Sequence, residues 1–490
     1  RTLTFSTIPD VEEGDVICIW NPTQGSWFAE RTNYYAGEYV RVAAVSGTTV
    51  SLQNALTATY TAASINLYRC TNFHTARYQG FTILGLQNTS SFGFSAKYLI
   101  DSTLQDVKVV GSGNACFSFG FAYNCSILCC SAQEDHTSQF GTDYALSIGN
   151  SQSINVKSGY YSASRHGVAI GGGAGVGSVV NRYITVSDCT ILNSASMTGA
   201  DAHSNSEFVT FDNCTIENGL SLGGINNRIT NNVFRGNNYI AQYLTGLKGM
   251  SFLFDGNYVE VGDYAVATWG TLFDVSGNLP TGFDPDTTEG GDFVIQNNTF
   301  VWNITGDRQD EFLKFMNRGA NPTGVPCNVY IKNNVFRIGT ATGKAVPGSI
   351  RVVDGRSYGT IEISGNHFIG LGGFGINHDV SPNFSADRVY ITDNRVINSG
   401  GIGFDVRDVR DRVVIKNNEI IGCKGVASRV QGRTGARTKT VHVSGNTFID
   451  NLLVDTGLST TNVDAYITEA DFVLCHDNFV GSENVFLILS

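Results

Sequence analysis

The chain has 490 residues, with 56 glycines, only 8 prolines and 15% charged residues. The net charge of -11 provides no basic stripe for phosphate backbones, and no apolar run reaches the roughly 18 residues of a membrane span, so the sequence argues against nucleic-acid binding and membrane insertion. Valine, isoleucine, phenylalanine, threonine and asparagine recur without a long helical pattern, which favours an all-β chain with many tight turns.

The first 72 residues predict a small antiparallel β domain. The stretches "EEGDVICIWNP", "AGEYVRVAAVSGTTVSLQ" and "INLYRC" alternate apolar and polar residues between glycine-containing turns. Because an uncovered strand edge invites aggregation, we expect this domain to cover the first coil of the segment that follows.

Residues 73–490 repeat one phrase, seen as "IKNNVFRIG" at 331–339. The spacing of its second polar residue varies from 24 residues (Asn394 to Asn418) to 41 (Asn257 to Asn298). A short minimum with irregular additions is typical of a solenoid whose coils close at a fixed perimeter while loops protrude. The repeated residues are Asn232, Asn257, Asn298, Asn334, Asn366, Asn394, Asn418, Asn446 and Asn478.

Each coil is expected to consist of short strands joined by a polar corner. Alternation predicts that Val329, Ile331, Phe336 and Ile338 point inward and Arg337 outward. Such strands bury their apolar faces only when coils stack in parallel about 4.8 Å apart. The corner asparagines would then bond along a column and adopt left-handed backbone angles. The sequence therefore predicts a right-handed parallel β-helix.

Eleven cysteines are spread along the chain without the spacing of a disulfide framework or a metal site. Cys189 in "VSDCTI" and Cys214 in "FDNCTI" occupy the position that asparagine holds elsewhere. We expect them to be buried and reduced, as in a protein that folds in a reducing compartment. No cofactor or metal is expected.

Polar residues appear at strand positions in three successive coils, "GTDYALSIGN", "SRHGVAIGGG" and "GADAHSNSEF". Counting from the following strands puts Ile148, Ile170 and His203 at one level. The same register aligns Asp143 with Arg165, Tyr144 with His166, and Leu146 with Val168 and Asp201. His166, Asp201 and His203 would then share one face, and Asp143 and Arg165 the other.

Two reactions fit this cluster. A glycosidase needs two carboxyl groups, about 5 Å apart for retention and about 6.5 to 9.5 Å for inversion. Asp143 and Asp201, two coils apart, would suit inversion, with Glu207, Glu134 or Asp135 as alternatives for the second carboxylate. A lyase would use Arg165 to neutralise a uronate, His166 or His203 as base, and Asp201 to orient the imidazole.

A purely structural interpretation is also open, in which Asp201 and His203 cap a corner and "RHG" is a surface turn. Trp269 and Trp302 are candidate sugar-stacking platforms or buried plugs, and Tyr144, Tyr161 and Glu134 are further candidates for substrate binding. Two other polar segments stand out: "TGDRQDEFLKFMNRG" (305–319) predicts a short helix, and "DVRDVRDR" (405–412) predicts an ion-paired flank.

The amino-terminal hairpins leading into irregular coils with "NNxF" corners resemble bacteriophage tailspikes and related depolymerases of the pectate-lyase-like β-helix superfamily. The resemblance implies a homotrimer in the virion tail, an upstream particle-binding domain or baseplate contact, and endo-cleavage of a bacterial surface polysaccharide, either O-antigen or capsule. Glycoside hydrolysis is favoured because tailspikes of this kind are more often glycosidases. A polysaccharide lyase and a non-catalytic glycan-binding adhesin are the alternatives.

Overall fold

The computed structural model describes residues 1–25, 35–60, 62, 65–85, 92–133, 143–173, 175–193, 198–203, 205–244, 252–261, 271–277, 292–303, 311–317, 328–339, 348–353, 358–370, 372–377, 386–399, 403–423, 425–432, 437–451, 463–481 and 485–489. The chain divides into two compact units: unit 1 comprises Arg1–Ile216 with Leu222–Asn227, and unit 2 comprises Glu217–Ser221 with Arg228–Ser490. Within these ranges, no helix is long and apolar enough to cross a membrane.

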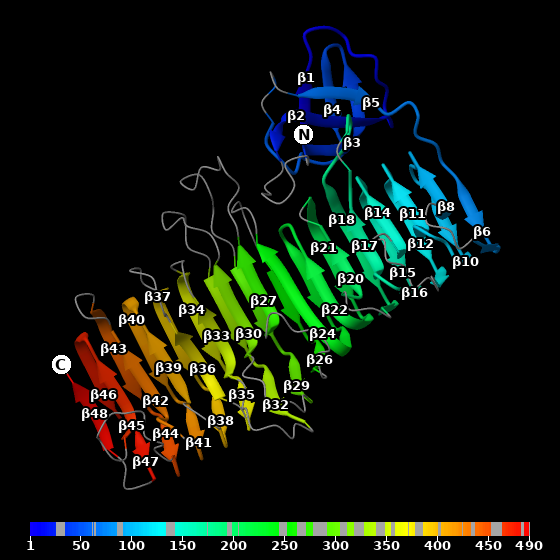
Figure 1. Ribbon diagram of the computed structural model, residues 1–490. Helices are drawn as coiled ribbons and strands as arrows, with labels where there is room; N and C mark the ends of the chain where they lie inside the picture. The colour runs from blue at the N-terminus through cyan, green and yellow to red at the C-terminus, as the bar shows by residue number, and fades with distance from the viewer. Residues whose placement is uncertain are drawn as a thin grey trace. The chain divides into compact units, whose positions relative to one another are not determined.

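Unit 1 begins with a five-stranded antiparallel sheet (Figure 1). Its strands are β1 (Thr2–Thr4), β2 (Val16–Gly25), β3 (Tyr35–Ser46), β4 (Thr49–Leu52) and β5 (Asn66–Arg69), in the order β1-β4-β3-β2-β5. Alternation along the strands buries Ile17, Ile19, Val40, Val42, Val50 and Leu52 in one cluster. The antiparallel sheet expected from the sequence is therefore present.

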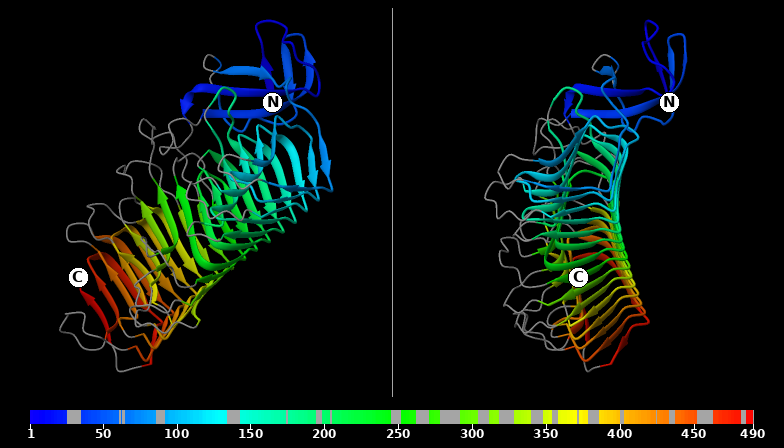
Figure 2. Two further views of the ribbon diagram at one scale, coloured as in Figure 1. Left: turned by 45° about the vertical axis from the view of Figure 1, so that its right-hand side comes forward. Right: turned by 90° about the vertical axis from the view of Figure 1, so that its right-hand side faces the viewer.

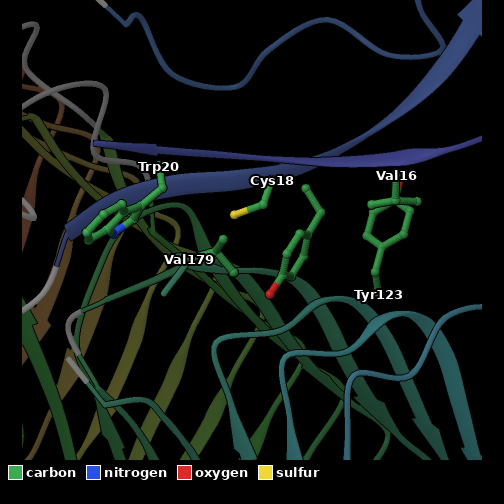
Figure 3. Packing of buried hydrophobic residues seen from close by; sticks show 6 residues of the cluster. Val16, Cys18, Trp20, Tyr123 and Val179 are labelled. Atoms are coloured by element: carbon green, nitrogen blue, oxygen red, sulfur yellow. The ribbon is translucent and has the colours of Figure 1, made fainter. Parts of the chain in front are cut away.

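The opposite face of this sheet packs on the parallel strands that follow in unit 1. Val16, Cys18, Trp20 and Tyr39 form a buried cluster with Tyr123 and Val179 (Figure 3). The Tyr39 amide also donates to Gln152 Oε1 at 2.8 Å. The contact thus combines burial of apolar side chains with a hydrogen bond to a backbone amide, and it lies on β12, β15 and the segment before β18.

The rest of unit 1 forms parallel coils of three strands each, which we group into rows A, B and C. Row A contains β6 (Arg77–Gln79), β9 (Thr103–Gln105), β12 (Tyr123–Leu128), β15 (Gln152–Lys157), β18 (Asn181–Ser187) and β21 (Ser206–Asp212). Row B contains β7 (Thr82–Leu84), β10 (Lys108–Val110), β13 (Ser131–Gln133), β16 (Tyr160–Ala163), β19 (Thr190–Asn193) and the start of β22 (Thr215–Leu222). Row C contains β8 (Phe92–Lys97), β11 (Ala115–Gly120), β14 (Tyr144–Gly149), β17 (His166–Gly171) and β20 (Ala200–Ala202).

Unit 2 is also built from three rows of parallel strands, which we again call A, B and C (Figure 2). Row A contains β25 (Phe252–Asp255), β28 (Asp292–Gln296), β31 (Asn328–Lys332), β34 (Tyr358–Ser364), β37 (Ala386–Thr392), β40 (Val409–Lys416), β43 (Thr438–Ser444) and β46 (Ala470–His476). Row B contains β26 (Tyr258–Val261), β29 (Thr299–Trp302), β32 (Val335–Ile338), β35 (His367–Ile369), β38 (Arg395–Ile397), β41 (Glu419–Ile421), β44 (Thr447–Ile449) and β47 (Phe479–Val480). Row C contains β27 (Thr271–Gly277), β30 (Glu311–Asn317), β33 (Gly348–Val353), β36 (Gly372–Asn377), β39 (Phe404–Arg407), β42 (Ser428–Gln431), β45 (Val463–Thr468) and β48 (Val485–Leu489). The remaining strands are β23 (Asn227–Thr230) and the long β24 (Val233–Leu244), which pairs with both β26 and β27.

The predicted asparagine column is present in unit 2. Asn418 is 1% exposed; its Nδ2 donates to Asn446 Oδ1 and to the Ile391 carbonyl, each at 2.9 Å. The same side-chain bonds link every successive pair from Asn232 to Asn478. The expectation about the backbone was wrong by one residue. The left-handed angle belongs to the preceding residue, with φ of 54° at Asn333 and 65° at Gly365.

The interior of the coils follows the predicted alternation. Val329, Ile331 and Phe336 are fully buried, whereas Ile338 is only partly covered. The Phe336 ring stacks on Phe300 and Phe368 with centroids 4.8 and 5.0 Å apart. These three rings, from successive coils, therefore form a continuous aromatic stack in the interior.

Cys189 and Cys214 occupy the corresponding corner position in unit 1, each 2% exposed. The Cys214 thiol donates to the Val186 carbonyl at 3.5 Å, as the asparagine amide does elsewhere. None of the ten cysteines within the described ranges forms a disulfide. The prediction of small, buried, reduced cysteines at these corners is confirmed.

The helix predicted over 305–319 is wrong. Glu311–Asn317 is strand β30, paired in parallel with β27 and β33. Strands on both sides satisfy its backbone groups, and this tertiary pairing overrides the local helical pattern. Asp307 and Asp310 lie outside the described residues. The flank over 405–412 is ion-paired as predicted, with Asp405 bonded to Arg407.

Candidate functional site

The three polar segments lie on neighbouring strands β14, β17 and β20 of row C in unit 1. Tyr144 pairs with His166 and Ile148 with Ile170, as predicted. Ala202 rather than His203 lies level with Ile170, so the predicted register of β20 was off by one residue. Core packing decides this register, because it places Ala202, which is 1% exposed, in the column of inward-pointing side chains.

The corrected register places Asp201 level with Ala169 on the outer side of row C. Asp201 Oδ2 lies 2.9 Å from His203 Nε2, and the two side chains are 13% and 22% exposed. When Nε2 donates to the carboxylate, the lone pair of a neutral ring is on Nδ1. Asp201 thereby sets the tautomer of a partly accessible imidazole.

Glycine at position 171 makes room for the His203 ring. A Cβ atom built on Gly171 would approach His203 Nδ1 to 2.9 Å and Cε1 to 3.2 Å, closer than side chains pack. On the outer side of β17, the small residues Ala169 and Gly171 face the pair formed by Asp201 and His203. The glycine therefore lets the imidazole pack directly against the backbone of β17.

His166 is a second imidazole of different character. It is 4% exposed, its ring stacks on Tyr144 with centroids 5.8 Å apart, and its Nδ1 lies 2.6 Å from the Thr198 carbonyl. That carbonyl accepts the Nδ1 proton, which leaves the lone pair on Nε2. Burial lowers the pKa of His166, Asp201 opposes the shift, and Arg165 adds to it. His166 is therefore held neutral.

The predicted common face of His166, Asp201 and His203 is not formed. His166 has the parity of the inward-pointing Val168 and Ile170, whereas Asp201 pairs with Ala169. The prediction failed because it rested on the shifted register of β20. The groups remain close enough for the charge of Asp201 to act on the His166 ring.

Arg165 and Asp143 lie beside Tyr144. The Arg165 guanidinium carbon is 5.4 Å from the centroid of the Tyr144 ring, within the range of a cation–π contact. Asp143 is 1% exposed, and its carbonyl accepts the amides of Arg165 and His166. Asp143 Oδ1 and Arg165 Nε are both buried without a hydrogen-bond partner among the described residues.

Glu207 is not available as a second catalytic carboxylate. It is 6% exposed, lies level with Arg182 in row A, and accepts from Arg182 Nε at 2.7 Å. Arg182 Nη1 lies 3.9 Å from Glu38 of the antiparallel sheet. The carboxylate of Glu207 neutralises a buried guanidinium, which corrects the expectation from the sequence.

Two of the proposed sugar contacts are also corrected. Tyr161 is fully buried, and burial raises the pKa of its phenol well above the ordinary value. Trp302 is 2% exposed. Both side chains fill the interior of a coil and cannot stack on a ligand from outside. Glu134, Asp135 and Trp269 lie outside the described residues.

The sequence did not identify two residues that hold the site together. Asn193 Nδ2 donates to the carbonyls of Arg165 at 2.6 Å and Thr198 at 3.1 Å, and Thr198 in turn receives the His166 ring proton. The available signal was a polar residue, Asn193, at the end of strand β19, in the same coil as His203. No group of three or more metal-ligating side chains occurs in the part of the chain that the structure describes.

Two family models match the chain. Residues 1–70 match the Ig-like domain of tailspike-like proteins, and residues 111–346 match a family described as Gp49, pectin lyase-like. No curated protein sequence matches. The first match coincides with the antiparallel sheet, and the second includes every strand of the candidate site.

Three solved structures share the fold. The tailspike gp49 from Pseudomonas phage LKA1 is 24% identical with a TM-score of 0.63, over 76% of this chain and 63% of its own. The tailspike gp61 from Pseudomonas phage phi297 is 22% identical with a TM-score of 0.61, over 80% and 60%. The gp54 tailspike of Acinetobacter baumannii bacteriophage AP22, solved with a capsular saccharide, is 18% identical with a TM-score of 0.50, over 80% and 62%.

The chain thus spans about three fifths of the length of each of these structures. At this level of identity the likeness establishes the fold, a right-handed parallel β-helix preceded by a small antiparallel domain.

Proposed function

From the two family models we propose that the chain is a bacteriophage tailspike of the pectate-lyase-like β-helix type, and that it binds and internally cleaves a bacterial surface polysaccharide. The observation that carries the proposal is the pair formed by Asp201 and His203 on the outer side of row C, where the His203 ring packs against Gly171. Interior residues of a solenoid serve stability, so a polar pair facing outward over small residues is suited to a ligand.

The geometry supports β-elimination better than hydrolysis. Hydrolysis needs two carboxyl groups that reach the glycosidic bond. Among the described candidates only Asp201 is partly exposed, because Asp143 is buried and Glu207 is ion-paired. A base aided by one orienting carboxylate is what elimination requires, so we revise the sequence-based preference for glycoside hydrolysis.

In the proposed reaction, His203 removes the proton from the carbon next to the carboxylate of a uronate residue. Arg165 neutralises that carboxylate and so favours loss of the proton. The electron pair forms a carbon–carbon double bond as the glycosidic carbon–oxygen bond breaks, the leaving oxygen takes up a proton from water, and the proton held by His203 returns to the hydroxide that this leaves. Asp201 stabilises the imidazolium that forms on His203.

The remaining parts of the proposal rest on the family. We propose that the chain works as a homotrimer in the virion tail and that its amino-terminal Ig-like domain adjoins a particle-binding part. The saccharide in the structure of the AP22 tailspike supports glycan binding by this fold. A non-catalytic adhesin is the competing function, and it would bind glycan without shortening it.

One assay separates these possibilities. The protein is incubated with purified O-antigens and capsules, and both reducing ends and the ultraviolet absorbance of unsaturated uronates are followed. Both signals together would support elimination, whereas new reducing ends alone would identify a hydrolase. Binding without either signal across a panel that contains the host glycan would identify an adhesin. Sedimentation of the same sample tests the trimer.

A further inference from the structure

Two histidines meet on the outer side of row A in unit 2, on a part of the fold that the proposed function does not use. His442 lies on β43 and His476 on the neighbouring strand β46, which is an edge of row A within the described ranges. Val441 and Val443 point into the coil, so the intervening His442 points outward. The ring centroids are 5.1 Å apart.

The two Nε2 atoms lie 3.0 Å apart. Two nitrogens bound to one ion at about 2.1 Å and a right angle are separated by about 3.0 Å, the arrangement of neighbouring ligands around octahedral or tetragonal ions. A tetrahedral zinc ion would need a separation of about 3.4 Å. We propose that His442 and His476 form a site for a divalent transition-metal ion of the nickel or copper class.

Asp477 completes the arrangement in the way typical of metal-binding histidines. Its Oδ2 lies 2.7 Å from His476 Nδ1. A carboxylate that accepts the Nδ1 proton leaves the lone pair on Nε2 and directs it at the ion. Asp477 is placed by the corner itself, because it holds the left-handed position, with φ of 55°, before Asn478 of the asparagine column.

The ion would keep water in its other positions. Within the described ranges no third protein ligand joins the two imidazoles, because Asp477 contacts His476 at the nitrogen that faces away from His442. Lys416 and Arg412 are close enough to act electrostatically on His442, which limits affinity for a cation. The site therefore selects an ion that binds imidazole strongly rather than a hard, oxygen-seeking cation.

Metal binding would fasten β46 to β43. The register pairs His442 with Leu474 and Ser444 with His476, so a bridge between the histidines spans two adjacent strands diagonally. An ion that binds only the folded chain stabilises it by mass action.

The test uses the 490-residue chain prepared without a polyhistidine tag and titrated calorimetrically with nickel chloride. We expect saturable binding of one ion per chain, lost or weakened at least tenfold in His442→Ala and in His476→Ala. His367→Ala removes an exposed histidine elsewhere in unit 2 and should bind as the unmodified chain does. His442→Gln serves as a second variant should His442→Ala not fold.

Absence of saturable nickel binding by the unmodified chain would overturn the site, and so would undiminished binding by either folded histidine variant. Asp477→Asn should weaken binding by roughly tenfold. Hydrogen exchange then locates the effect: nickel should slow exchange of the β46 amides in the unmodified chain and leave β34 unchanged. Equal slowing of both strands would contradict a local clip.

Discussion

Asp201 and His203 are two residues apart, so strand alternation by itself brings them to one side of the chain. Their pairing at 2.9 Å and partial exposure are consequences of β20 lying in register with β17. A carboxylate in this position orients an imidazole and supports its charge. Its loss should therefore affect chemistry much more than folding.

We predict that Asp201→Asn lowers depolymerase activity by roughly 100-fold or more, the loss expected when acid–base catalysis fails. The melting temperature should stay nearly unchanged, because asparagine has the same shape and keeps an oxygen that accepts the proton of His203 Nε2. Asp393→Asn, an exposed aspartate in unit 2, is the matched control and should retain activity. If Asp201→Asn unfolds, the role of Asp201 is structural and not catalytic.

His166 leads to a prediction about pH. Its folded-state pKa is lowered by burial, so over a range below about pH 6.5 the native ring stays neutral while the unfolded chain takes up a proton. The unfolded state then binds more protons, and the free energy of unfolding falls as the pH drops through that range. His166→Asn lacks this titration.

Urea unfolding between pH 7 and pH 5 should therefore show a shallower loss of stability in His166→Asn than in the unmodified chain. The comparison cancels the contributions of the other titrating groups, which the two chains share. Parallel pH dependences would contradict the assignment of a neutral, buried imidazole.

At the scale of the elements, the asparagine corners divide two tasks between adjacent residues. Asn417 takes the left-handed backbone angle, with φ of 56°, whereas Asn418 bonds along the column. Three corners of unit 2 carry glycine at the first position, namely Gly256, Gly365 and Gly445. The first residue therefore needs only conformational freedom, and the second needs an amide.

We predict that Asn418→Ala destabilises the chain by about 3 kcal/mol or more. The change leaves buried donors and acceptors of Asn394, Asn446 and Ile391 without partners, and each such group costs about 1 to 3 kcal/mol. Asn417→Gly, one residue away, should change stability by less than about 1 kcal/mol. Equal losses in both variants, measured by denaturant unfolding, would refute this division of tasks.

Unit 1 as a whole contains a buried ionic contact between segments far apart in the chain. Arg182 on β18 is 1% exposed and lies between Glu207 on β21 and Glu38 on β3 of the antiparallel sheet. Removing one partner from such a group leaves a desolvated charge. Substitution of Glu207 therefore tests whether stability and catalysis depend on different residues.

We predict that Glu207→Gln lowers the free energy of unfolding by about 3 kcal/mol and leaves the activity of the folded protein unchanged. Glu419→Gln is the matched control, because its bond to Arg395 is as short, at 2.6 Å, but both side chains are at least 40% exposed. Its loss should stay below about 1 kcal/mol. A large fall in turnover for Glu207→Gln at unchanged stability would restore the catalytic role.

Prediction from the sequence succeeded where a pattern was local and repeated. The phrase around Asn334 recurs often enough to identify the corners, and "YALSIG" beside "HGVAIG" was sufficient to pair Tyr144 with His166. The prediction failed for β20, because this strand was aligned by counting residues back through a corner and not by the alternation of its buried alanines. It also failed for Glu207, whose partner Arg182 is 25 residues earlier and was not considered.

The sequence by itself determined the coil, its corners and the inward columns, because period-two alternation acts within a single coil and the corner asparagine recurs at the same place in successive coils. Only the tertiary structure decided which polar residues meet. Stacking sets the register between coils through buried side chains such as Ala202, and a shift of one residue moves Asp201 to the outer face. The same stacking brought His442 and His476, 34 residues apart, within 3.0 Å, because neighbours across coils are chosen by packing rather than by distance along the chain.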